Sequence, residues 1–170
     1  MNPDKYLISN IDGLDDSTYG LLSGPAFALT FAVFGIFGGV ISDKVNRKML
    51  AGFFCIFWSL TTLLPGLSAN IYVLFVSRFL LGFFEAPFNP CAYSMISDYF
   101  HPSNRGTANA YFNSAIYIGG ALGSLSTNML SALGWQLVYV IVAIIGIAFG
   151  VLGLFLVKEP VRGFFDVKVE

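Results

Sequence analysis

Two long apolar runs are separated by the stretch Gly39-Val40-Ile41-Ser42-Asp43-Lys44-Val45-Asn46-Arg47-Lys48, and this arrangement indicates the fold class. It places one acid and three bases within six residues at the boundary between those runs. A short charged connection between apolar runs of helical length is typical of a tight hairpin of membrane helices.

The composition also favours a membrane protein. Of the 170 residues, 56% are hydrophobic and only 11% are charged, and the net charge is -1. A water-soluble domain of this length needs a more polar exterior. Nothing in the charge indicates a nucleic-acid partner, and the sequence shows no metal-ligand spacing, no cofactor motif and no nucleophile–base constellation. We therefore predict an all-α integral membrane protein, embedded in the lipid bilayer, that is not an enzyme.

Five segments are long and apolar enough to cross a hydrocarbon core about 30 Å thick, which takes roughly 20 residues of helix. They cover residues 18–41, 49–67, 71–96, 105–130 and 135–157. The fourth is diluted by Asn109, Asn113 and several glycines, so we expect it to face a cavity or a protein interface. The predicted organisation is a polar N-terminal segment (1–17), a five-helix transmembrane domain (18–157) and a polar C-terminal tail (158–170).

The basic residues gather on one side of these five spans. That side holds Lys44, Arg47, Lys48, Arg105, Lys158, Arg162 and Lys168. The connections on the other side, residues 65–70 and 131–134, carry no charge. By the positive-inside rule, the N-terminus is expected outside and the C-terminus in the cytosol or matrix. The organelle stays open, and the mitochondrial inner membrane is one option for a subunit of a complex.

The third span carries two charges at membrane depth. At about 100° per residue, Arg78, Glu85 and Asn89 fall on one face of the helix. A mid-membrane arginine costs about 2.5–3.5 kcal/mol, so this face is expected to meet protein or water. Arg78 and Glu85 are about 10 Å apart along the axis, which favours a bridging water or another helix between them over direct pairing. The pair suits a substrate anchor and a proton or ion relay. The alternative is a buried charge pair that only fixes the register of the helix.

Prolines follow this pair in the same span. Pro87 and Pro90 are expected to bend or loosen the helix just past Glu85, because each lacks the N–H that the helix would use. Freed backbone carbonyls inside a membrane belong beside a cavity. On the fourth span, Asn113 and Tyr117 are expected to form part of a second inward face that contacts substrate or a coupling ion.

An acid and a base also flank the turn after the third span. Asp98 and Arg105 are expected to pair with charges of the first loop and form a latch at the basic end. The alternative is that they mark only the end of one helix and the start of the next. Small residues four apart let helix backbones approach closely, so Gly35-x-x-x-Gly39 and Gly119-x-x-x-Gly123 predict helix contacts. Gly146-x-x-x-Gly150 is a weaker pattern that chance alone can produce.

The order of these motifs resembles the N-terminal half of a major facilitator superfamily transporter, most closely of the Spinster-like branch. The first loop is similar to the superfamily pattern Gly-x-x-x-Asp-Arg/Lys-x-Gly-Arg-Arg/Lys, with Asn46 in place of its second glycine. The resemblance implies a left-handed turn position at Asn46, which asparagine tolerates better than most residues with a side chain. Three further segments are similar to the branch: Arg78-Phe-Leu-Leu-Gly82-x-x-Glu85-Ala86, Ile96-Ser-Asp98-Tyr-Phe and Lys158-Glu159-Pro160-x-Arg162-Gly163. The resemblance covers nearly the whole chain.

The resemblance implies a substrate cavity between two six-helix halves, with Arg78 and Glu85 in its lining. It also implies a cytoplasmic gate that contains Gly39, Asp43, Lys44, Arg47 and Lys48. Compared with the family, the chain is expected to be an N-terminal half that lacks the first helix. A cavity between two repeats requires both repeats, so we expect other membrane protein chains to cover the Arg78/Glu85 face.

Two functions follow from these expectations. The first is transmembrane transport of a small organic or lipid-like substrate by alternating access, if partner chains complete the fold. The second is a non-transporting structural accessory subunit of a large membrane protein complex. The contacts of Arg78 and Glu85 would discriminate between the two, because transporter-like helices of another chain favour the first and unrelated subunits or ordered lipid favour the second.

Overall fold

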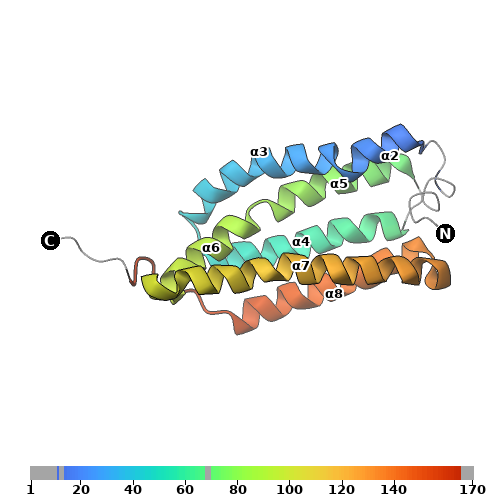
Figure 1. Cartoon of the computed structure of the whole chain (residues 1–170). Helices are drawn as coiled ribbons and strands as arrows, with labels where there is room; N and C mark the ends of the chain where they lie inside the picture. The colour runs from blue at the N-terminus through green and yellow to red at the C-terminus, as the bar shows by residue number, and fades with distance from the viewer. Residues whose placement is uncertain (1–10, 12–13, 68–69, 166–170) are drawn as a thin grey trace.

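The computed structural model describes residues 11, 14–67 and 70–165, and these are helical apart from short connections. The helices are α2 (Asp16–Ser23), α3 (Pro25–Ser42), α4 (Arg47–Leu67), α5 (Ile71–Glu85), α6 (Phe88–Tyr99), α7 (Pro102–Leu133) and α8 (Trp135–Leu156). Because α2 continues into α3 and α5 into α6, the described helices form five long rods that lie side by side in an elongated bundle (Figure 1). The prediction of an all-α, five-helix membrane fold is confirmed.

Four of the five rods are both long and apolar enough to cross a membrane. They are Asp16–Ser42, Arg47–Leu67, Ile71–Tyr99 and Trp135–Leu156. The remaining rod, α7, is the longest single helix with 32 residues, but it is less apolar than the other four. It occupies the position of the fourth expected span, whose asparagines and glycines dilute its apolar character in the same way.

Two rods contain a break in the helix. The predicted break just past Glu85 is confirmed, because α5 ends at Glu85 and α6 begins at Phe88. The break between α2 and α3 was not anticipated. It falls at Gly24, with φ -126° and ψ -77°, and Pro25 then begins α3. Proline is tolerated at the first position of a helix, where its missing N–H would have had no intrahelical partner.

The closest helix packing joins α4 to α8 and depends on glycines of α8. A Cβ atom added at Gly146 would lie 2.3 Å from Ser59 Oγ, and one at Gly150 would lie 2.7 Å from Ile56 Cγ1. Only glycine therefore permits this approach. The expectation is corrected here: a Cβ at Gly35, Gly39, Gly119 or Gly123 would meet nothing within 4 Å, so these glycines do not set the contacts between the described helices. Gly146-x-x-x-Gly150, which is the weaker pattern in the sequence, therefore lies at a close helix contact.

Apolar residues close the end of the bundle opposite the charged loop. Leu22 of α2, Leu74 of α5 and Trp135 of α8 are each 6% exposed or less and belong to one buried cluster. This cluster holds the starts of α5 and α8 together. The charged connections between α3 and α4 and between α6 and α7 lie together at the opposite end of the bundle (Figure 1).

Candidate functional site

The turn between α3 and α4 is closed by a helix cap. The Oδ1 atom of Asn46 accepts a hydrogen bond from the Met49 N–H at 2.8 Å, and α4 begins at Arg47. No non-glycine residue in the described part of the chain has a positive φ. The expected left-handed conformation of Asn46 is therefore wrong. Asn46 instead caps the helix, because a side-chain oxygen at this position can satisfy an N–H of the first turn.

Arg47 is the centre of a buried charge network at the same end of the bundle. Its side chain is 1% exposed. Its guanidinium donates to Asp98 Oδ2 at 2.5 Å, to Glu159 Oε1 at 2.9 Å and to Ser94 Oγ at 2.8 Å. A fourth hydrogen bond, at 3.2 Å, reaches the carbonyl of Pro160. This set of acceptors suits arginine, whose planar group presents five N–H donors in a fixed fork.

Glu159 brings the segment after α8 onto the start of α4. One carboxylate oxygen accepts from Arg47, and the other accepts from the Lys48 N–H at 2.7 Å. Partial burial raises the pKa of Glu159, but hydrogen bonds from the Lys48 N–H and from Arg47 outweigh it and hold that pKa below its ordinary value. The carboxylate is thus ionised near neutral pH and lies at the positive end of the α4 dipole.

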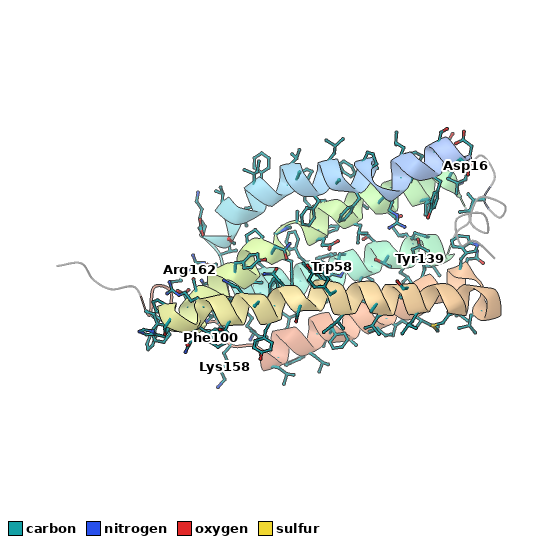
Figure 2. The ribbon with its side chains drawn as sticks, viewed as in Figure 1. Asp16, Trp58, Phe100, Tyr139, Lys158 and Arg162 are labelled. Carbon is teal, nitrogen blue, oxygen red and sulfur yellow. The ribbon has the colours of Figure 1, made fainter. Side chains whose placement is uncertain are left out.

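The next residues of this segment bind the turn between α3 and α4. Arg162 donates to the carbonyls of Ser42 at 2.7 Å and Val45 at 2.6 Å, and it also donates to the carbonyl of Asp43. The Gly163 N–H donates to Asp98 Oδ1 at 2.9 Å. Figure 2 shows Arg162, Phe100 and Lys158 gathered at this end of the bundle. Residues 159–163 therefore tie the ends of α3, α4 and α6 together.

The other residues predicted for the gate lie around this network. The carbonyl of Gly39 accepts from Ser42 Oγ at 2.7 Å and from the Asp43 N–H at 3.3 Å. The side chains of Asp43 and Lys44 are exposed. Arg105 donates to the Phe100 carbonyl at 3.3 Å across the turn between α6 and α7. Among the described carboxylates, those that bind Arg47 are Asp98 and Glu159 rather than Asp43.

The polar face of the third span is divided between α5 and α6. Arg78 Nη2 donates to the hydroxyl of Tyr139 in α8 at 2.8 Å, and its guanidinium carbon lies 6.0 Å from the centre of the same ring. Glu85 is the last residue of α5 and is partly buried, and Asn89 lies in the first turn of α6. In the described part of the chain, no carboxylate pairs with Arg78. The Arg78 guanidinium therefore binds a neutral hydroxyl from another helix, α8.

The predicted inward residues of α7 are only partly brought together. Asn113 Oδ1 accepts from the Tyr93 hydroxyl at 2.6 Å, and Asn113 Nδ2 donates to the Asn109 carbonyl at 2.8 Å. Tyr117 is 81% exposed. The side-chain oxygen of Asn109 is buried with no hydrogen-bond partner among the described residues. An unsatisfied buried acceptor costs about 1–3 kcal/mol, so this oxygen destabilises the packing of α7 against its neighbours within the described bundle.

Sequence reasoning assigned no role to several residues of these contacts. Glu159 and Arg162 stand in the Lys158–Gly163 motif that carries the family resemblance, and their charge is a signal that would have found them. Ser94 and Tyr139 carry no such signal, since serine and tyrosine are common in membrane helices. Only the packing of α6 and α8 against their neighbours brings these two hydroxyls to an arginine.

Comparisons with known proteins agree on one family. The family model described as Major Facilitator Superfamily matches residues 6–168. A probable galactarate/D-glucarate transporter of Bacillus subtilis is 36% identical over 155 residues, which cover 87% of this chain and 34% of that protein. A sphingosine-1-phosphate transporter of Danio rerio is 31% identical over 155 residues, covering 89% of this chain and 31% of that protein.

Solved structures give the same result for the fold. A bacterial homologue of the human lysosomal transporter Spinster, in an inward-facing and unoccupied conformation, superimposes with a TM-score of 0.84 at 29% identity. The match covers 98% of this chain and 39% of that one. The chain spans about a third of the length of the curated relatives it matches. This chain is an integral membrane protein of the Major Facilitator Superfamily and resembles its Spinster-like transporters.

Proposed function

We propose that this chain forms part of the N-terminal half of a secondary transporter that moves an organic anion by alternating access. Alternating access in this class of protein needs two repeats. The proposal therefore includes further helices, either from more of the same polypeptide or from other chains. The end that carries the Arg47 network would face the cytosol or matrix, since the basic connections gather there.

The observation that carries the proposal is the environment of Arg78. Its guanidinium lies at membrane depth and meets the neutral hydroxyl of Tyr139, and no described carboxylate balances its charge. Unpaired charges inside a membrane are costly and typically mark substrate or ion pathways. A guanidinium whose charge is not balanced by a carboxylate is suited to binding a carboxylate or phosphate of a ligand, often through two parallel hydrogen bonds.

The names of the relatives support an anionic substrate. Galactarate and D-glucarate are dicarboxylates, and sphingosine-1-phosphate carries a phosphate. These substrates belong to those proteins, but they share the charge that Arg78 would bind. Glu85 would serve as the proton or ion relay, since it lies on the same rod at the break before α6. The Arg47–Asp98–Glu159 network would hold the helix ends of the gate together as the two halves move.

The exposed tyrosines of α7 support the need for further helices. Tyr111 is 77% exposed and Tyr117 is 81% exposed. Polar groups of a helix that packs against α7 can form hydrogen bonds with these phenol hydroxyls, whereas lipid tails cannot. The accessory-subunit alternative would place an unrelated chain against the same tyrosines.

Uptake measurements test the proposal. The full chain would be purified with the chains that remain bound to it and reconstituted into vesicles. We expect uptake of labelled galactarate but not of its neutral polyol analogue. Arg78→Gln should abolish this uptake because it removes the charge. Glu85→Gln should also abolish it, without unfolding the protein.

Two controls make the result specific. Tyr72→Phe changes a 75% exposed residue at the start of the same helix and should leave uptake unchanged. Arg78→Lys keeps the charge but loses the planar fork, so partial uptake is expected. Wild-type vesicles without uptake, together with crosslinks from position 78 to an unrelated chain, would refute transport and favour the accessory-subunit alternative. Unchanged uptake in Glu85→Gln would remove Glu85 from the relay.

A further inference from the structure

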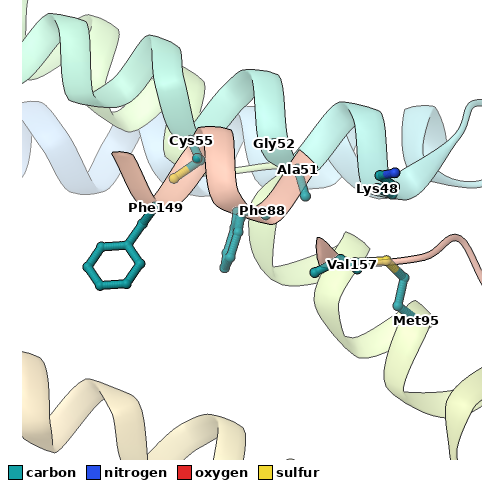
Figure 3. A pocket seen from close by; sticks show the side chains of 10 residues that line it. Lys48, Ala51, Gly52, Cys55, Phe88, Met95, Phe149 and Val157 are labelled. Atoms are coloured by element: carbon teal, nitrogen blue, oxygen red, sulfur yellow. The ribbon is translucent and has the colours of Figure 1, made fainter. Parts of the chain in front are cut away.

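An apolar cleft lies between α4, α6 and α8, near the charged end of the bundle. Its volume is about 230 Å³. Ala51 and Cys55 of α4, Phe88 and Met95 of α6, and Phe149 and Gly153 of α8 are among its lining residues. Figure 3 shows Lys48 at one end of the cleft and Phe149 toward the other. None of the residues predicted for substrate binding or coupling lines this cleft.

The dimensions of the cleft suit a single alkyl chain. Pockets for drug-sized ligands are typically about 300–1,000 Å³, so this cleft is small for a compact organic molecule. On α4 it extends from Lys48 to Cys55, or about 10 Å at 1.5 Å per residue. Apart from the ammonium of Lys48, its lining side chains are hydrocarbon, aromatic or sulfur-containing. An apolar slot that runs along α4 from Lys48 to Cys55 therefore matches part of a lipid tail.

Positive charge remains at the mouth of the slot. Within the network, the two cations Arg47 and Arg162 are matched by the two anions Asp98 and Glu159. Lys48 lines the cleft, and its ammonium has no hydrogen bond or ion pair to any described residue. Lys158 follows directly on Val157, another lining residue, and is exposed (Figure 2). An anionic group at this end would therefore meet ammonium groups that are not neutralised.

We propose that the cleft binds one acyl chain of an anionic phospholipid, with the phosphate of that lipid against the Lys48 ammonium. The lipid belongs to the leaflet at the basic end of the protein. Basic pockets between membrane helices on that side are known to suit anionic headgroups. The site differs from the proposed substrate site, because its lining comes from the faces of α4, α6 and α8 rather than from the Arg78 face of α5.

Native mass spectrometry of the full chain in detergent tests this site. Phosphatidylglycerol and phosphatidylcholine with identical acyl chains would be added in turn. We expect one phosphatidylglycerol per chain, with higher occupancy than phosphatidylcholine. Lys48→Gln should lower the affinity for phosphatidylglycerol about five-fold, which is the effect expected of one lysine near a phosphate. Glycerol phosphate, which has the headgroup but no acyl chain, should not compete.

A second variant tests the acyl slot itself. Gly153 lines the cleft, and a Cβ there meets nothing within 4 Å, so the side chain of Gly153→Leu would start in open space. It should occupy the slot and abolish binding of both lipids. The matched controls are Lys44→Gln in the exposed loop and Gly120→Leu in the open part of α7, neither of which lines the cleft. Both should bind lipid like the wild type. Equal occupancy by the two lipids in the wild type, or unchanged binding in either Lys48→Gln or Gly153→Leu, would overturn the proposal.

Discussion

Arg47 Nη1 lies 2.5 Å from Asp98 Oδ2 and joins the start of α4 to the end of α6 through side chains that are 1% and 8% exposed. The two residues are 51 positions apart in the chain. A charge pair buried this deeply is costly to desolvate, and its geometry must repay that cost. Here the guanidinium also donates to Ser94, Glu159 and the Pro160 carbonyl, so most of its N–H groups have a hydrogen-bond acceptor.

Neutralising Asp98 should strongly destabilise the bundle. Asp98→Asn removes a charge that Arg47 needs while the guanidinium stays buried. Leaving a buried charge wholly uncompensated typically costs about 3–5 kcal/mol. Because Glu159 still binds Arg47 in this variant, we expect a smaller cost of about 1–3 kcal/mol. The free energy of unfolding in detergent, measured by denaturant titration, should fall by an amount in this range. Asp43→Asn is the matched control, because Asp43 is exposed at the same end, and it should have little effect. Equal losses of unfolding free energy in Asp98→Asn and Asp43→Asn would show that the buried network does not account for the stabilisation.

Two substitutions distinguish a helix cap at Asn46 from a left-handed turn residue at the same position. Asn46→Ala removes the acceptor for the Met49 N–H and should cost about 0.5–2 kcal/mol in unfolding free energy. Asn46→Gly should cost only a few tenths of a kcal/mol, because glycine is itself an acceptable cap. Thermal unfolding of the three proteins in parallel measures the difference. A variant Asn46→Gly that is more stable than the wild type would instead indicate a left-handed residue.

Acid should release residues 159–163 from the start of α4. The pKa of Glu159 is lower in the folded protein than its ordinary value. Its contribution to stability is therefore fully present above the unfolded pKa, about 4.3, and is lost as the pH falls through the folded value. Hydrogen exchange of the Gly163 N–H, which donates to Asp98, should become faster in this acid range, after correction for intrinsic rates.

A variant that lacks the carboxylate isolates the effect of Glu159. Glu159→Gln cannot ionise, so its hydrogen exchange at Gly163 should be faster than in the wild type at neutral pH and should change less on acidification. The same acid dependence in Glu159→Gln and the wild type would show that Glu159 is not responsible for the transition.

Glycines of α8 and α7 should respond in opposite ways to the same substitution. Gly150→Ala places a Cβ 2.7 Å from Ile56 Cγ1 and 3.2 Å from the Ile56 backbone nitrogen, and such overpacking typically costs about 1–3 kcal/mol. Gly119→Ala meets nothing within 4 Å and should stabilise α7 by about 0.5–1 kcal/mol through helix propensity. Thermal unfolding in detergent compares the two. Destabilisation by Gly119→Ala would indicate a close contact with a helix outside the described bundle.

Features that depend on neighbours in the sequence were predictable. The membrane class and the helices follow from the length of the apolar runs, because a helix in a bilayer satisfies its own backbone. The break past Glu85 follows from Pro87, since proline cannot supply the N–H that a helix requires. The break at Gly24 was missed although Pro25 marks it, because the hydropathy of the run continues without interruption.

Features that depend on which helices pack together were not predictable. Gly119-x-x-x-Gly123 and Gly146-x-x-x-Gly150 have the same spacing, yet only the second pair lies against another described helix. The partner of Arg78 is Tyr139, which is 61 residues away on α8. Spacing along one helix shows which residues share a face, but it does not show which helix that face meets.

An integral membrane bundle with an uneven distribution of basic residues can be predicted from the amino-acid sequence, because both properties are sums over local composition. The short motifs of the sequence also carry the family resemblance. The binding of Arg47 to Asp98 and Glu159, which are 51 and 112 residues away from it, becomes visible only in the folded bundle. A charge network at the end of a bundle needs groups from several helices at hydrogen-bond distance. That distance is set by helix packing, which no local pattern specifies.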